Sequence, residues 1–178
     1  PGAEIASHTN RARHGMQTRW RVLPRCFGRY EILGRGVAVA EVEEICVATD
    51  TLSFEDYLAC RALSLTVELF HNSGAFSELT GLLHQHSISP SAFLRAVDGL
   101  AAGKDSPVAD LYDAYLEENV AKLRDNRAEL VDYLGDGQVV DLHISGELGS
   151  SELYKARALA QFWRQEDLHD IAFDAARE

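Results

Sequence analysis

The sequence is poor in the residues that cross-link a protein or anchor it in a membrane. Its three cysteines, Cys26, Cys46 and Cys60, are odd in number and far apart, which argues against a disulfide scaffold and favours a reducing compartment. No apolar run approaches the roughly 18 residues of a membrane span, and the first residues lack the apolar stretch of a signal peptide. We therefore expect a cytoplasmic protein that has no membrane partner.

Positive charge is also scarce, and it is unevenly distributed. The 178 residues hold 17 Lys and Arg against 28 Asp and Glu, a net charge of -11 that argues against nucleic-acid binding. Residues 1–36 nevertheless carry seven arginines against Glu4 and Glu31, a balance of +5, which leaves -16 for residues 37–178. The sequence thus predicts two parts, a basic arm at 1–36 and an acidic domain at 37–178.

The basic arm is expected to form short elements. Ser7 or Thr9 can cap a brief helix, and Gly15 is placed to end it because glycine accepts the left-handed conformation. Residues 18–23 (TRWRVL) alternate as a strand does, and we expect Pro24 to stop that strand because proline cannot donate to a ladder. The start at Pro1, without an initiator methionine, also suggests a processed or fragmentary chain.

The acidic domain is expected to be mainly helical. β-branched residues at 37–47 (VAVAEVEEICV) favour a strand, and 138–145 favours a second, shorter one. A sharp helix start follows at Ser53 and Asp56, whose spacing resembles a capping box. Apolar spacing, caps and glycine stops predict six helices, at 54–71, 75–86, 89–102, 106–134, 151–165 and 166–176. The predicted fold is a mainly α, helical C-terminal domain with a small β element from the N-terminal arm.

Residue patterns that carry chemistry on their own are missing. There is no CxxC pair and no compact CxxxCxxC cluster motif, so the cysteines are expected to be buried or inert thiols. His84 and His86 are two residues apart and cannot share a helix face as metal ligands do. Nucleotide-binding and nucleophile-elbow motifs are absent as well. A catalytic site would have to be assembled from remote residues.

The arginines of the basic arm remain as candidate binding residues. Arg19 and Arg21 lie on one face of the predicted strand 18–23. Such a row of guanidinium groups can clamp an acidic partner, a phosphate or a carboxylate. It can also contact the acidic domain of the same chain, and the charge division favours this second interpretation. Either interpretation predicts that the arm is bound to acidic groups, those of a partner or those of this chain.

The order of motifs resembles a known family. Pro1 to Glu4 (PGAE), Arg11 with residues 14–16 (HGM), and 18–28 (TRWRVLPRCFG) resemble the segment that leaves the barrel in cobalamin-binding radical SAM proteins. Residues 44–61 (EICVATDTLSFEDYLACR) resemble the start of their helical C-terminal region. The resemblance covers residues 1 to about 85, and the rest shares only helical character. Ala3 stands where the family often has threonine, so no hydroxyl role is carried over.

The resemblance implies that this chain is the C-terminal accessory region of such an enzyme. The parent enzyme would hold a four-iron four-sulfur cluster, S-adenosylmethionine and possibly cobalamin, and this chain would hold no cofactor and would not be catalytic alone. Its partner would be the barrel domain of the same protein, and residues 1–36 would be the edge of that barrel and a connector. The resemblance implies that the residues at the edge of the barrel or facing the substrate are Gly2, Glu4, Arg19, Arg21 and Arg25. The alternatives are a stand-alone helical interaction module and a small enzyme.

Overall fold

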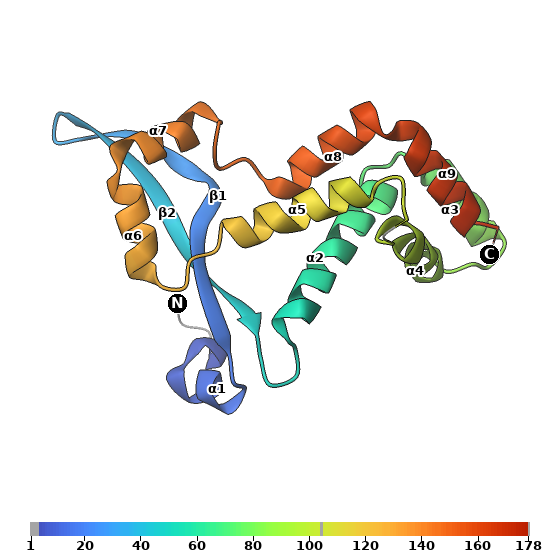
Figure 1. The fold of residues 1–178 in the computed structure, drawn as a ribbon, viewed down its shortest axis with the longest axis horizontal. Coiled ribbons are helices and arrows are strands. Elements are labelled where there is room, and N and C mark those ends of the chain that lie inside the picture. The colour runs from blue at the N-terminus through green and yellow to red at the C-terminus, as the bar shows by residue number, and fades with distance from the viewer. Residues whose placement is uncertain (1–3, 104, 178) are drawn as a thin grey trace. The chain divides into compact units, whose positions relative to one another are not determined.

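The fold is mainly helical with one small antiparallel sheet, as the sequence predicts (Figure 1). The computed structural model describes residues 4–103 and 105–177. Its elements are η1 (Glu4–Ala6), α1 (His8–Arg13), β1 (Gln17–Ile32), β2 (Arg35–Ala48), α2 (Phe54–Val67), the π-helical η2 (Glu68–Asn72), α3 (Ser77–Gln85), α4 (Pro90–Ala101), α5 (Ala109–Ala121), α6 (Arg127–Gly135), α7 (Gly137–Ser145), α8 (Glu152–Trp163) and α9 (Gln165–Ala175).

The chain forms two compact units whose limits differ from the predicted parts. Unit 1 consists of Pro1–Tyr57 and Asn119–Ser151, and unit 2 of Leu58–Glu118 and Glu152–Glu178. The predicted limit between residues 36 and 37 falls inside β2, so the basic arm and the first acidic residues share one hairpin. The change in charge along the chain is therefore not a change of structural unit.

Unit 1 is built on the β1–β2 hairpin. The strands pair from Gln17 opposite Ala48 to Ile32 opposite Arg35, and the turn consists of Leu33 and Gly34. Pro24 does not end β1, contrary to the prediction. The register shifts between Val22 and Phe27, so the residues around the proline bulge out and the ladder resumes beyond them. A bulge accommodates the missing backbone donor that would otherwise end pairing.

Two helices cover the hairpin, and both correct the prediction. Residues 137–145 form helix α7 rather than a strand, because the Asp136 side chain accepts a hydrogen bond from the Gln138 N–H at 3.0 Å and caps the first turn. The buried residues Val140 and His143 then recur at helical spacing. The His143 ring packs edge-on against Phe27 of β1 with centroids 5.5 Å apart, which fixes α7 on the hairpin.

The long helix predicted at 106–134 is divided into α5 and α6. Asn126 caps α6, because its side chain accepts a hydrogen bond from the Glu129 N–H at 3.0 Å. Just before it, Trp20 and Arg124 exchange backbone hydrogen bonds of 2.8 and 2.7 Å, so this stretch is paired with β1. A residue whose backbone pairs with a strand cannot continue a helix. The apolar spacing that predicted one long helix therefore runs across the break between α5 and α6.

Unit 2 contains the main hydrophobic core. Its largest fully buried side chains include Phe70, Leu65 and Leu69, and α3, α4, α5, α8 and α9, with the segments just before α3 and α5, supply further core residues. The starts of α2 and α4 follow the predicted caps. Ser53 and Asp56 exchange hydrogen bonds as a capping box does. The Ser89 side chain accepts a hydrogen bond from the Ala92 N–H, and Pro90 occupies the first position of α4.

Candidate functional site

A polar cluster surrounds Glu44 on β2, where Arg11 of α1 and Thr18 of β1 meet it. Arg11 donates two hydrogen bonds to the Glu44 carboxylate, at 2.6 and 2.9 Å, and the Thr18 hydroxyl donates a third at 2.7 Å. These donors stabilise the charged form, so the Arg11 guanidinium and then Thr18 hold the pKa of Glu44 below its ordinary value. The bidentate geometry makes this ion pair directional as well as strong.

The other paired arginines of the arm also contact carboxylates of this chain. Arg21 lies 2.7 Å from Glu43 on β2, and Arg29 lies 2.5 Å from Asp141 on α7. Arg19 forms an ion pair with Asp125, which precedes α6. The second interpretation of the row is therefore confirmed for these residues, because the arm docks onto acidic groups of its own protein. None of these guanidinium groups needs an external anion to compensate its charge.

The remaining predicted site residues are not brought together. Gly2 lies outside the described residues. Glu4 is exposed in η1, and its carbonyl oxygen accepts a hydrogen bond of 2.7 Å from Asn10. Arg25 is exposed in the bulge of β1 with a φ of +64°, a conformation that costs energy for a residue with a Cβ. The hairpin therefore collects Arg19, Arg21 and Arg25 on β1 without forming one pocket from them.

Acid should weaken unit 1 through Glu44. Its pKa is lower in the folded chain than in the unfolded chain, so its stabilisation is complete above its ordinary value of 4.5 and is lost as the pH falls through the folded pKa. Between these two values Glu44→Gln should flatten the pH dependence of the free energy of unfolding, measured by urea titration at several pH values. Glu41→Gln, on the same strand, is the control, and an equal flattening there would contradict the role of Glu44.

The cysteines do not form a cluster-binding set. Cys46 and Cys60 are exposed, which contradicts the expectation that they are buried, and Cys26 is partly buried. Cys46 lies at the edge of β2, where its thiol donates to the Ala48 carbonyl oxygen at 3.3 Å. Within residues 4–103 and 105–177, no three His, Cys, Asp or Glu side chains are grouped to hold a metal ion.

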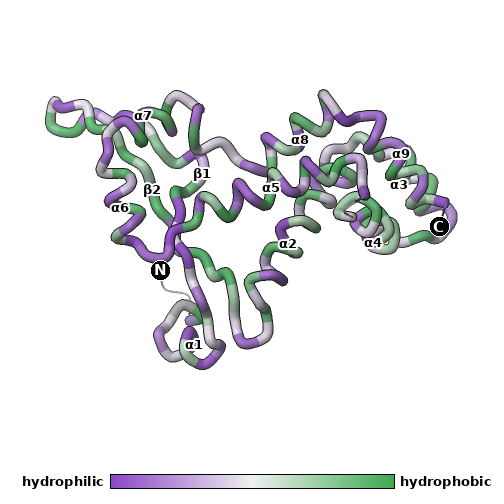
Figure 2. The backbone as a smooth tube through the Cα atoms, viewed as in Figure 1, coloured by the Kyte–Doolittle hydropathy of each residue, from purple (hydrophilic) through white to green (hydrophobic). Residues whose placement is uncertain are grey.

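Sequence reasoning missed an apolar group at the tip of the hairpin. Tyr30, Ile32 and Val37 are exposed there, and the Leu33 side chain is 98% exposed. Leu33 also has a φ of +51° in front of Gly34 at +73°, a two-residue turn of the kind in which asparagine or glycine is preferred. Leu33 is thus unfavourable in both solvation and backbone conformation. Figure 2 shows apolar and hydrophilic residues side by side at this end of the hairpin.

Replacing Leu33 with asparagine should stabilise the protein. Asparagine tolerates the left-handed conformation and is soluble, so Leu33→Asn should raise the free energy of unfolding by about 0.5–1 kcal/mol. Chemical denaturation of the two proteins measures this difference. Leu82→Asn, which changes an exposed leucine within α3, should instead destabilise slightly, because asparagine is a poorer helix former. A destabilised Leu33→Asn protein would contradict the assignment of the turn.

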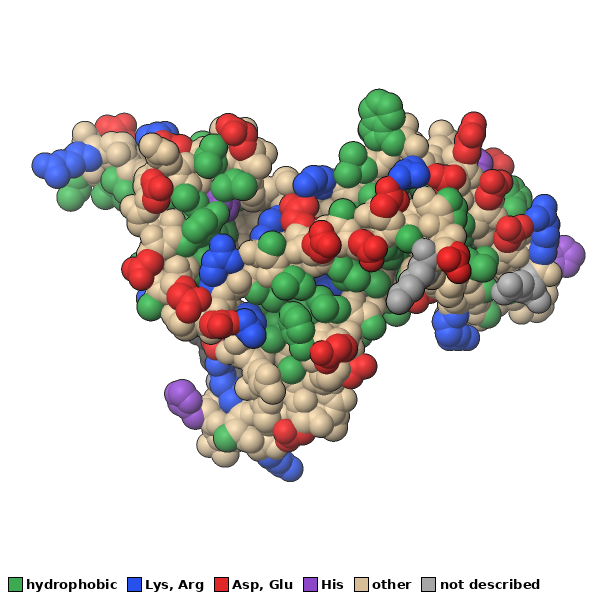
Figure 3. Space-filling view, viewed as in Figure 1, with side chains coloured by type: hydrophobic (Ala, Val, Ile, Leu, Met, Phe, Trp, Pro, Cys, Tyr) green, Lys and Arg blue, Asp and Glu red, His purple; other side chains and the backbone are tan. Residues whose placement is uncertain are grey.

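A second exposed apolar group ends α8 in unit 2. Phe162 and Trp163 are each 79% exposed, and Leu159 lies one turn before them. Figure 3 shows hydrophobic side chains projecting from the surface at the end of α8. Large exposed aromatic side chains of this kind mark interaction surfaces in soluble proteins.

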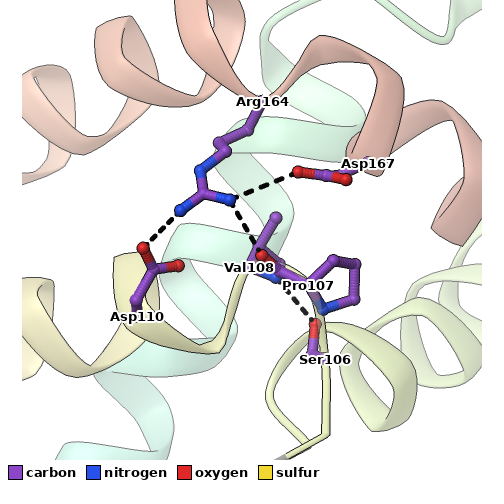
Figure 4. Close-up of polar contacts among 6 residues, drawn as sticks. All are labelled: Ser106, Pro107, Val108, Asp110, Arg164 and Asp167. Carbon is purple, nitrogen blue, oxygen red and sulfur yellow. Dashed lines mark hydrogen bonds and ion pairs between the residues drawn. The ribbon is translucent and has the colours of Figure 1, made fainter.

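Arg164, the residue after Phe162 and Trp163, holds the end of α8 in place. Arg164 forms ion pairs with Asp110, in the first turn of α5, and with Asp167 at 3.5 Å (Figure 4). It also donates to the Pro107 carbonyl oxygen at 3.2 Å. The junction of α8 and α9 is thereby tied to the start of α5. Phe162 and Trp163 are presented by a fixed backbone, which reduces the entropy lost when a partner binds.

The buried polar groups of unit 2 serve the fold. The Thr66 hydroxyl lies 2.6 Å from Asp98 and 2.9 Å from the Tyr112 hydroxyl, so helices α2, α4 and α5 share one hydrogen-bonded network. Burial raises the pKa of Tyr112, which keeps its phenol protonated. A neutral phenol held among core side chains can position helices, and it offers no base to a substrate.

Comparison with protein-family models and with curated proteins finds no match to this chain. In the part of the chain that the structure describes, no helix is long and apolar enough to cross a membrane.

Proposed function

We propose that this chain is the C-terminal accessory region of a cobalamin-binding radical SAM iron–sulfur enzyme. In that role it caps the barrel domain or faces its substrate and performs no chemistry alone. The partner is the barrel domain of the same parent protein, and neither nucleic acid nor a membrane is involved. The proposal begins with the motif order in residues 1–28 and 44–61.

One structural observation carries the proposal. The two stretches that bear the resemblance are paired strand to strand, with Thr18 opposite Cys46 and Trp20 opposite Glu44. Arg11 and Thr18 from the first stretch both bind Glu44 from the second. Residues far apart in the sequence are thus parts of one local structure. This pairing supports the interpretation that both stretches belong to one family pattern rather than matching it separately by chance.

The cofactors of the parent enzyme fall outside the described residues in this proposal. A four-iron cluster needs cysteine thiolates, and the three cysteines of this chain lie on β1, β2 and α2 without forming such a set. The cluster, S-adenosylmethionine and cobalamin are therefore assigned to residues upstream of Pro1. The residues of this chain would supply shape and charge, with the paired arginines holding the hairpin that adjoins the barrel.

The gene sequence upstream of Pro1 tests the proposal directly. We expect a CxxxCxxC motif within the few hundred residues that precede Pro1 in the same reading frame. The protein of the whole gene, reconstituted anaerobically with iron and sulfide, should then absorb in the region of 400 nm, as iron–sulfur proteins do, and bind about four iron atoms. This chain alone, treated identically, is the control. A reading frame without the motif, or equal iron binding by this chain alone, would refute the proposal.

The exposed aromatic pair on α8 favours a second candidate, a stand-alone helical interaction module. A fixed helix end that presents Phe162 and Trp163 has the anchors that dominate protein interfaces. Binding to a partner unrelated to any barrel enzyme, lost on Trp163→Ala and kept on Trp20→Ala, would favour this candidate. Trp20 is the matched control because it is the other tryptophan of the chain and lies on β1.

A further inference from the structure

The outer edge of β2 has no strand beside it. Among residues 4–103 and 105–177 the sheet contains only β1 and β2, and the isolated bridges, Trp20 with Arg124 and Thr49 with Leu52, leave β2 unpaired on that side. In this part of the chain residues 35–47 exchange backbone hydrogen bonds with β1 alone (Figure 1). Such an edge presents a row of N–H and C=O groups that a further strand can bind.

The pairing of Trp20 identifies the backbone groups on this edge. Trp20 directs its N–H and C=O to Arg124, so its pair with Glu44 is one of the pairs without hydrogen bonds. The N–H and C=O of Glu44 therefore point away from β1. The two kinds of pair alternate along an antiparallel ladder, so Val42 and Cys46 have the same orientation as Glu44. Each of the three residues offers a donor and an acceptor at the outer edge.

β2 lacks most of the features that protect an edge from pairing. Its sequence, RGVAVAEVEEICVA, has neither lysine nor proline, and the bulge of the hairpin puts its extra residues in β1. Two of its carboxylates are compensated, because Glu43 is paired with Arg21 and Glu44 with Arg11. Glu41 is exposed and forms no ion pair with any described residue. The edge is therefore open, with one uncompensated negative charge beside it.

The carboxylates of β2 decide which kind of strand fits. Two copies of β2 can pair antiparallel only in registers that match their outward-facing residues. Every such register centred on residues 41 to 44 sets one glutamate opposite another, and like charges directly opposite destabilise a sheet. A strand with Lys or Arg opposite Glu41 forms an ion pair instead. The charge therefore favours a basic segment over a second copy of this chain.

We propose that the outer edge of β2 binds an extended, basic segment of another polypeptide as a third strand of the sheet. Val42, Glu44 and Cys46 exchange backbone hydrogen bonds with this segment, and one of its Lys or Arg side chains lies opposite Glu41. The backbone then provides the affinity, and the side chains provide the selectivity. The contact uses groups of unit 1 alone and does not depend on the radical SAM proposal.

Binding of a synthetic peptide to the purified chain tests the proposal. The probe is acetyl-TRVRVRVT-amide, in which arginines alternate with β-branched residues that favour a strand. The control peptide, acetyl-TEVEVEVT-amide, has the same pattern and the opposite charge. Fluorescence anisotropy of the labelled peptides should show binding of the basic peptide and at least about tenfold weaker binding of the acidic one.

Proline substitutions distinguish the edge from general attraction to an acidic protein. Val42→Pro removes an outward N–H and keeps the ladder with β1, so it should weaken binding of the basic peptide by about tenfold. Val22→Pro is the matched control, because Val22 is the partner of Val42 and its N–H faces the opposite edge of the hairpin. It should leave binding unchanged. Glu41→Lys should weaken binding of the basic peptide by about two- to fivefold and strengthen that of the acidic one.

Amide hydrogen exchange measured by NMR tests the edge independently. In the free chain the N–H groups of Val42 and Glu44 should exchange fast, whereas those of Glu43 and Ile45, which face β1, should exchange slowly. The basic peptide should slow the exchange of Val42 and Glu44.

Three results would each overturn the proposal. The first is a basic peptide that does not bind, or that binds equally well to Val42→Pro. The second is binding that is lost on Val22→Pro and kept on Val42→Pro, which would assign the peptide to the edge of β1. The third is slow exchange of the Val42 and Glu44 amides in the free chain, which would show that another part of this protein covers the edge.

Discussion

Phe70→Ala should lower the free energy of unfolding by about 3–5 kcal/mol. Phe70 lies in η2 and is 1% exposed, and its ring stacks on that of Phe76 with centroids 5.2 Å apart. Truncation to alanine removes the buried ring and leaves a cavity that the surrounding helices cannot fully close, so the transfer and cavity costs add. Urea unfolding followed by helical circular dichroism measures the loss.

The control makes the same substitution where the ring is exposed. Phe162→Ala should change the free energy of unfolding by less than about 0.5 kcal/mol. The difference between the two variants therefore measures burial rather than residue type. Equal losses in the two variants, or a Phe70→Ala protein as stable as the parent, would show that the core of unit 2 is not packed as described.

The parts of the fold that follow local rules could be predicted from the sequence. The start of α2 is set by Ser53 and Asp56, and the start of α4 by Ser89 and Pro90, because a cap and its partner lie within one turn. Gly15, expected to end the first helix, has a φ of +55° just after α1. These signals need no information about distant residues.

The errors arose where a distant residue decides the local structure. The pairing of Trp20 with Arg124 interrupts an apolar spacing that is otherwise continuous from α5 to α6. Pro24 suggested the end of a strand, but β2 continues to pair with β1 beyond the bulge. At 137–145 the β-branched residues suggested a strand, whereas the contact of His143 with the distant Phe27 holds a helix there, which begins at the local cap Asp136. Tertiary contacts override local propensity in each case.

The candidate site was predictable in kind but not in detail. The division of charge indicated that the arm docks onto acidic residues, and Glu43, Glu44, Asp125 and Asp141 are the residues it contacts. Their identity depends on the register of the hairpin, which composition does not encode. The exposed Leu33 did carry a signal, a leucine before glycine between two strands, but it becomes unusual only once both strands are paired around that turn.

Arg157→Leu should cost about 2–4 kcal/mol, because it leaves a buried carboxylate without its cation. Glu68 in η2 is buried, and its carboxylate accepts a hydrogen bond of 2.6 Å from Arg157 on α8 and one of 3.2 Å from Asn72. Arg157 itself is partly exposed, which places the loss below the full cost of breaking a buried pair. Urea unfolding at neutral pH measures the loss.

The double variant Glu68→Leu with Arg157→Leu separates the unpaired charge from lost packing. Removing both charges abolishes the desolvation cost, so the double variant should be more stable than Arg157→Leu alone, by about 1–3 kcal/mol. Lys155→Leu, which breaks the more exposed pair with Glu118, is the control and should cost no more than about 1 kcal/mol. A double variant less stable than Arg157→Leu would mean that Glu68 is held chiefly by its other contacts. The ion pair would then not be what joins η2 to α8.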